Sequence, residues 1–194
     1  MKTIFYIFIL FNIIHSAVNP INNQQEILIN QIDSRYLYTL PDFPASVEYS
    51  NQSRRFKYGH KFDTDLSINN SGVWKTLPNG DRVWKLVIKS HGAYAIKLQF
   101  DEINIPKGTQ LFIYNQSGDI SYGPYNSESN FINRTFGSPL IQGDAAVIEF
   151  FQPSHISENP YIHISNVIHD YTDIFKFNSE GRDRDCGENV ACES

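Results

Sequence analysis

The feature that most constrains this chain is a two-residue alternation of apolar and polar side chains that begins after Gly72. In the clearest segment, residues 93–100, one face is formed by Tyr94, Ile96, Leu98 and Phe100. Lys97 and Gln99 fall on the other face. Because successive side chains of a strand point to opposite faces, this pattern predicts strands with one buried face. No long stretch combines helical periodicity with start and stop signals, so βαβ units are not expected.

Turn residues divide the alternation into short strands. The turn 77–81, which contains Asn79-Gly80, predicts a hairpin between residues 73–75 and 82–88. The further expected strands are 93–100, 110–114, 120–125, 138–141, 145–151 and 161–168, of which 120–125 contains Gly and Pro and is expected at an edge. Short strands at this spacing predict an all-β fold, an antiparallel β-sandwich that is jelly-roll-like and spans residues 72–174.

The flanking segments differ from the sandwich in composition. Residues 18–71 are expected to form an extended, partly packed N-terminal arm in which 26–29 could be a short strand. The C-terminal segment 175–194 is polar and charged around residues 178–185, so a disordered tail or linker is expected there. It carries three basic residues that are expected processing points for a protease: Lys176, Arg182 and Arg184.

The first residues have the pattern of a signal peptide, which is expected to comprise residues 1–17. Lys2 precedes an apolar run, residues 4–14, that small residues close, and cleavage is expected after Ser16 or Ala17. This run is about half of the ~20 residues that cross a bilayer as a helix, so no membrane span is expected after signal removal. The chain is therefore predicted to be secreted. The alternative is a buried N-terminal strand.

The charge and the cysteine content limit which partners and cofactors are expected. The formal net charge is −5 and no basic run exceeds Arg54-Arg55, so nucleic acid is not an expected partner. Cys186 and Cys192 are the only cysteines, and in an oxidising compartment they are disulfide candidates. Their spacing permits a local bridge without requiring one. Zinc would need further ligands beside them, and no metal or other cofactor is expected.

No local motif for covalent catalysis is present in the sequence. It contains neither a Gly-x-Ser-x-Gly turn nor a His-Glu-x-x-His helix, so the chain is not expected to be an enzyme by itself. His163 and His169 are six residues apart, which predicts one shared strand face. About 20 Å of strand would separate them, too far to share an ion, so His163 is expected on the solvent face and His169 at the strand end. Asp101 and Glu102 are expected to be solvated at a strand end.

Two other residue sets could contribute to binding or modification. Four aromatic residues could form a platform that stacks on sugars, although core packing is the favoured interpretation: Trp74, Trp84, Tyr94 and Phe100. Four Asn-x-Ser/Thr sequons start at Asn51, Asn69, Asn115 and Asn133, and they matter only in a eukaryotic secretory pathway.

Several sequence pieces together resemble the N-terminal pro-region of secreted lysyl endopeptidase-like serine proteases. The longest is Gly72–Leu86 (GVWKTLPNGDRVWKL). It is followed in the family's order by Ser90–Tyr94, Ile105–Tyr114, Gln142–Asp144, Glu149-Phe150 and Ile168–Tyr171. Cys186–Glu193 is similar to the start of the protease domain itself. The resemblance covers about residues 54 to 194.

The resemblance implies a trypsin-like protease downstream of the pro-region, with a His, Asp and Ser triad and cleavage after lysine. None of those positions lies in this chain, so no catalytic residue is carried over. Residues 175–194 are interpreted as a linker and the start of a missing protease domain. Either the chain is a fragment of a longer product, which we favour, or it is a stand-alone relative that has lost its enzyme.

Two functions are therefore expected from the sequence. The first is a non-catalytic pro-domain that packs on a downstream or cognate protease domain and assists its folding or holds it inactive. The alternative is a secreted or surface binding module that contacts glycans or proteins through an exposed aromatic patch. Exposure of Trp74 and Trp84 distinguishes these interpretations. An active enzyme would need a triad assembled from residues without a local motif.

Overall fold

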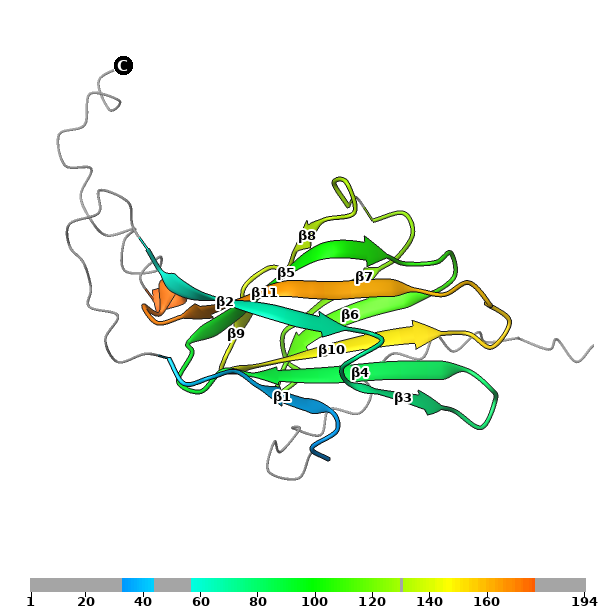
Figure 1. The fold of residues 1–194 in the computed structure, drawn as a ribbon, viewed down its shortest axis with the longest axis horizontal. Coiled ribbons are helices and arrows are strands. Elements are labelled where there is room, and N and C mark those ends of the chain that lie inside the picture. Colours follow the sequence, from blue (N-terminus) through cyan, green and yellow to red (C-terminus); the bar gives the residue numbers. More distant parts are fainter. Residues whose placement is uncertain (1–32, 44–56, 130, 177–194) are drawn as a thin grey trace, which may run out of the picture.

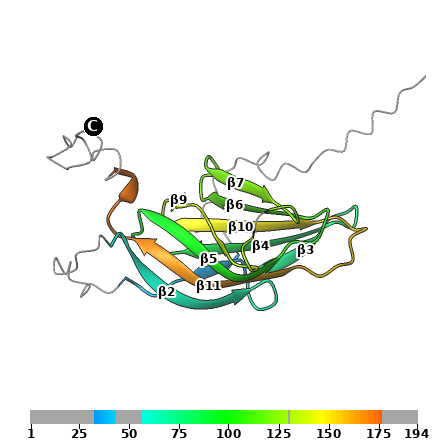
Figure 2. The ribbon, with the colours of Figure 1, turned by 90° about the horizontal axis from the view of Figure 1, so that it is seen from above.

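The protein is an all-β sandwich of two sheets (Figure 1). The computed structural model describes residues 33–43, 57–129 and 131–176. Turning the molecule by a quarter shows β5 and β11 in one layer and β4, β6 and β10 in the other (Figure 2). The prediction of an all-β sandwich is therefore confirmed.

The first sheet has six strands, in the order β1-β4-β10-β6-β7, with β3 also paired to β4. Their bounds are β1 Leu37–Thr39, β3 Val73–Thr76, β4 Arg82–Lys89, β6 Gln110–Asn115, β7 Ser121–Tyr125 and β10 Ala145–Gln152. The central strand β10 is antiparallel to both β4 and β6. The expected hairpin is present as β3 and β4, and β7 lies at the edge where its Gly and Pro residues predicted it.

The second sheet has five strands, in the order β2-β11-β5-β8, with β9 also paired to β5. Their bounds are β2 Gly59–Ser67, β5 Ala95–Asn104, β8 Phe136–Gly137, β9 Ile141–Gln142 and β11 Tyr161–Asp170. All of these pairings are antiparallel. The pairing of β11 with β2 shifts register between Ile164 and Asn166.

The core lies between the two sheets and is built from the inward faces of their long strands. Trp84, Phe150 and Ile148 of the first sheet are fully buried, as are Leu98 and Phe100 of the second. These residues belong to one continuous apolar cluster. Burial of such side chains contributes about 1.5–3 kcal/mol each, which makes this layer the main source of stability.

The sandwich begins before Gly72, which corrects the expected boundary of the N-terminal arm. Nine residues of that segment form β2, and β1 adds the parallel pair Leu37↔Val87 to a sheet expected to be antiparallel throughout. Tyr36 and Leu37 also pack on Val87, on the outer face of the first sheet. The alternation of β2, whose polar residues interrupt the apolar ones, gave a weaker signal than the strands after Gly72.

Tyr94 is the other departure from the predicted pattern. The alternation placed it on the buried face with Ile96 and Leu98, which are fully buried. Tyr94 is 52% exposed because β5 begins at Ala95, so Tyr94 belongs to the preceding turn.

Several sequence predictions concern residues outside the described ranges. They are the signal peptide 1–17 with Ser16 and Ala17, the strand at 26–29, Cys186 and Cys192, and the tail beyond Lys176. Within residues 33–43, 57–129 and 131–176, no helix is long and apolar enough to span a membrane.

Gly72 allows the β3–β4 hairpin to close over the core. Its φ is +68°, and a Cβ there would lie 2.5 Å from the Lys85 carbonyl oxygen and 2.9 Å from Nε1 of Trp84. The indole Nε1 donates a hydrogen bond to the Ser71 carbonyl at 2.8 Å. This close approach ties the bend at Ser71-Gly72, just before β3, to Trp84, the largest buried side chain.

We expect Gly72→Ala to lower the free energy of unfolding by about 2–4 kcal/mol, because left-handed strain adds to a steric clash with backbone. Gly92→Ala is the matched control, since Gly92 has φ +75° and open space around the added Cβ. It should cost about 1 kcal/mol. Urea unfolding followed by tryptophan fluorescence measures both, and equal losses would contradict the role of the clash.

Candidate functional site

Three of the sequence pieces that carry the protease pro-region resemblance meet at one end of the sandwich. We call residues 90–94, 142–144 and 168–174 the exit corner, because the described chain leaves the sheets there. The Ser90 amide donates to the Asp144 carbonyl at 2.8 Å, and the Gly143 amide donates to the Tyr94 carbonyl at 2.8 Å. The Tyr94 amide donates to the Asp170 carbonyl at 2.9 Å. Backbone hydrogen bonds therefore join the three pieces directly.

A buried serine–histidine pair lies inside the exit corner. Ser90 Oγ and His169 Nδ1 are 2.7 Å apart, and the two residues are 1% and 2% exposed. Desolvation by burial is the largest cause that lowers the pKa of His169 below its ordinary 6.5, and His60 adds to it against the opposing charge of Asp170. The neutral imidazole is therefore the form that the folded protein favours.

Aromatic rings cover this histidine. The ring of Phe43 stacks on His169 with 4.9 Å between centroids and an interplanar angle of 6°, and it also stacks on Tyr171 at 5.2 Å. His60 meets Phe43 edge to face at 5.6 Å. Phe43 is thus held against the exit corner, and the imidazole is shielded from solvent.

Asp170 fixes the path of the chain beyond β11. Its side chain accepts hydrogen bonds from the Thr172 amide at 2.8 Å and the Ile174 amide at 3.0 Å, and Asp170 is fully buried. Ile174 is itself 9% exposed and opens the short helical turn 174–176. Because buried acceptors need donors, this arrangement directs the exit of the chain with backbone amides.

The Ser90–His169 pair has the atoms of a nucleophile and a base but not their accessibility. A serine nucleophile must reach a substrate carbonyl, whereas Ser90 is enclosed and His169 is stacked under Phe43. The Asp170 carboxylate is committed to the amides of Thr172 and Ile174 rather than to the imidazole. The geometry stabilises the corner and offers no path for acyl transfer.

A second histidine lies on the outer face of the second sheet. His163 Nδ1 is 2.5 Å from Asp101 Oδ1, and its Nε2 is 2.9 Å from Asp65 Oδ1. Partial burial lowers the pKa of His163, but the hydrogen bonds to Asp65 and Asp101 outweigh this and hold the pKa above 6.5. Only an imidazolium can donate to both carboxylates, so the charged form is favoured.

The prediction that His163 and His169 share one strand face is wrong. Ile162 and Ile164 are buried before the register shift, whereas Val167 and His169 are buried after it. The irregularity between Ile164 and Asn166 inverts the alternation, so His163 faces outward and His169 inward. The expected solvent face for His163 and the strand-end position of His169 hold.

Asp101 and Glu102 lie near the end of β5 with half-exposed side chains, as expected from the sequence. Asp101 contacts His163, and the Glu102 carboxylate lies 2.9 Å from the guanidinium of Arg134. The two carboxylates therefore serve different partners. Both pairs lie at the surface, where such interactions contribute little to stability.

The four aromatic residues do not assemble into a stacking platform. Trp84 and Phe100 are fully buried in the core. Trp74 packs edge to face on Phe150 with 6.0 Å between centroids, and Arg82 covers its ring at 4.1 Å. Only Tyr94 is exposed, at the exit corner. Core packing, the favoured interpretation, is confirmed for Trp84 and Phe100.

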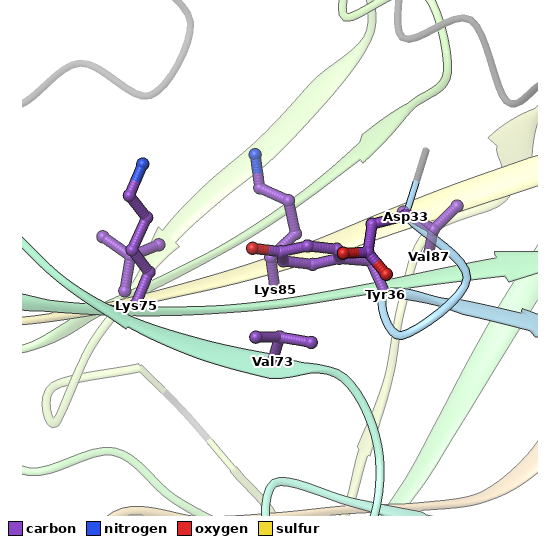
Figure 3. A pocket seen from close by; sticks show the side chains of 7 residues that line it. Asp33, Tyr36, Val73, Lys75, Lys85 and Val87 are labelled. Atoms are coloured by element: carbon purple, nitrogen blue, oxygen red, sulfur yellow. The ribbon is translucent and has the colours of Figure 1, made fainter. Parts of the chain in front are cut away.

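A shallow groove of about 340 Å³ runs along the outer face of the first sheet (Figure 3). Its apolar floor is formed by Val73, Val83 and Val87. Figure 3 shows Lys75 and Lys85 reaching out in the same direction, with Lys85 beside the ring of Tyr36. Lys85 is neutralised by Glu149 at 2.7 Å, and Asp33, the remaining lining residue, is bound by Arg35.

The structure also separates the sequons. Asn69 and Asn133 are exposed in turns. Asn115 is 7% exposed and its side-chain amide donates to Asp119 at 2.6 Å, so a glycan there would disrupt the turn. The sequon at Asn51 lies outside the described residues.

Comparisons with protein-family models, with curated proteins and with solved structures gave no match.

Sequence reasoning missed the contacts that define the exit corner. Ser90 and His169 lie 79 residues apart, and no local motif links them. Their only signal was that both fall within pieces of the pro-region resemblance. The His163 clamp was equally hidden, because its carboxylates come from β2 and β5 on either side of β11.

We expect His169 to make the protein less stable in mild acid. Its folded-state pKa lies below the unfolded value of 6.5, so the unfolded chain binds more protons as pH falls through 6.5. Urea unfolding at pH 7.5 and pH 5.5 should show a loss of stability that is smaller in His169→Gln. His91→Gln, at an exposed position, is the control. An equal acid loss in His169→Gln and wild type would contradict this assignment.

His163 should act in the opposite direction. Its folded-state pKa lies above 6.5, so its stabilisation is complete below 6.5 and is lost as pH rises through the folded value. We expect Asp101→Asn and Asp65→Asn each to lower the pKa of His163, because each removes a carboxylate that holds the imidazolium. An NMR titration of the imidazole proton measures this shift, and Asp63→Asn is the nearby control. An unchanged His163 pKa in both variants would show that the clamp is absent in solution.

Proposed function

We propose that this chain is the non-catalytic N-terminal pro-domain of a secreted serine endopeptidase, and that it assists the folding of the protease domain or holds it inactive. The observation that carries the proposal is the exit corner. Three pieces of the pro-region resemblance, separated in sequence, are joined there by hydrogen bonds at the point where the chain leaves the sandwich. The pieces occur together in the resemblance because they build the same corner of the fold.

The way in which the chain leaves the sandwich supports this role. Asp170 anchors Ile174 through its backbone amide, so Lys176 follows a fixed point. Cutting the chain after Lys176, Arg182 or Arg184 would leave both sheets and the corner intact. A pro-domain requires such a separation, because it must remain folded while processing detaches it.

The exit corner and Phe175, which directly follows it, expose apolar side chains. Tyr94 is 52% exposed and Phe175 is 38% exposed, and the only other large apolar side chain that is exposed among the described residues is Ile132, on the loop before β8. Tyr94 is bonded to Asp170 through its amide, and Phe175 follows the bonded Ile174. We therefore place the contact with the protease domain at this corner.

The test is refolding of a lysyl endopeptidase-like protease domain with and without this chain supplied in trans. We expect the chain to raise the yield of folded protease, or to inhibit the folded enzyme until the chain is cleaved. Tyr94→Ser should weaken the effect, because it removes exposed apolar surface from the proposed contact. Ile132→Ser, which removes similar surface away from the corner, is the matched control.

Protease yield and activity that are unaffected by the chain would overturn the proposal. An effect that Tyr94→Ser and Ile132→Ser leave equally intact would support the pro-domain function and reject the corner as its contact surface. Circular dichroism of both variants verifies that the sandwich itself is unchanged.

A further inference from the structure

Among the described residues, no strand pairs with the outer edge of β2. With nine residues, β2 is the longest of the strands that lie at a sheet edge in the described part of the chain. Its inner neighbour is β11, and Figure 2 shows no coloured strand on its other side. A long strand edge of this kind offers backbone donors and acceptors to a further strand.

The hydrogen bonds of β2 identify which residues direct their backbone N–H and C=O groups away from β11. At one end Tyr58 accepts from the Tyr171 amide, and at the other end the Ile68 amide donates to Ile162. In the regular stretch from Tyr58 to Asp63, before the register shift, even-numbered residues therefore bond toward β11. The N–H and C=O groups of Lys61 and Asp63 point away from the sheet, because backbone groups alternate along an antiparallel strand.

The two residues whose backbone groups point away from the sheet, Lys61 and Asp63, carry side chains of opposite charge. Lys61 and Asp63 project from the outer face with side chains that are 58% and 82% exposed, and they contact each other at 2.9 Å. Phe62 lies between them and packs toward the core. Charged edges usually prevent pairing, but a strand that carries both signs at neighbouring outward positions can complement a reversed copy of itself.

We propose that β2 pairs with β2 of a second copy of this chain, antiparallel and centred on Phe62. In this register Lys61 lies opposite Asp63 of the second copy, and the two-fold axis repeats the pair. The outward backbone groups of the same residues meet in the same register, so hydrogen bonds and charge pairs form together.

Two neighbouring two-fold registers are less favourable. Moving the centre to Lys61 places that lysine opposite itself, and moving it to Asp63 places two carboxylates opposite each other. Like charges that directly face each other across strands are destabilising. Among these three registers, charge complementarity therefore selects the one centred on Phe62.

The test is sedimentation equilibrium of the full chain, produced by secretion from an expression host, at low salt over a range of concentrations. We expect a monomer–dimer equilibrium. Lys61→Asp and Asp63→Lys should each raise the dissociation constant at least about tenfold, because each replaces two attractive pairs with two repulsive ones. The double variant K61D/D63K should restore dimerisation, since the exchanged charges again face each other.

Lys107→Asp is the matched control for Lys61→Asp, because it makes the same change in net charge at an exposed turn away from β2. Circular dichroism shows whether each variant is folded. A wild-type chain that stays monomeric at every concentration would overturn the proposal, and the charges would then serve to block pairing. A dimer that survives both single variants, or is not restored in the double variant, would reject this edge or this register.

Discussion

The structure depends on the burial of apolar side chains between two sheets, which form one continuous core cluster. The only cysteines in the sequence are Cys186 and Cys192, beyond the sandwich. Trp84, Phe150 and Phe100 meet in the core without solvent exposure. The turn at Gly72 and the indole hydrogen bond to Ser71 then fix how the β3–β4 hairpin covers this layer.

Polar interactions act on this core at its margins. At the exit corner, Ser90 and His169 bond inside the protein, and Asp170 binds the amides of the chain that leaves. On the outer face, His163 is held by two carboxylates. The two histidines favour opposite protonation states because one is desolvated and the other is surrounded by negative charge. The fold thus contains two groups that titrate with opposite effects on stability.

The proposed pro-domain function and the proposed β2 pairing use different groups of the molecule. The exit corner lies where β11 ends, and it would face a protease domain. The β2 edge offers backbone groups and alternating charges to a second copy. The two surfaces are adjacent at the start of β2, where Gly59 pairs with Asp170 of the corner, while the proposed pairing is centred further along the strand at Phe62.

The sequence by itself determined the fold class and most of the strands. Alternation after Gly72 needs only local information, since the period of two reports one buried face, and the Gly and Pro of β7 marked an edge for the same local reason. It could not find β1 and β2 as members of the sheets, because their pattern is short or interrupted by charge and their pairing partners are far along the chain.

Only the tertiary structure decided which polar residues meet. A single irregularity in β11 places His163 and His169 on opposite faces of the sheet. No residue type in the sequence predicts that irregularity. Ser90, which follows β4, and His169 of β11 lie 79 residues apart and meet only because the chain folds. Side-chain periodicity is a local property of the sequence. Strand register and long-range contacts are set by how the strands pair and how the two sheets pack.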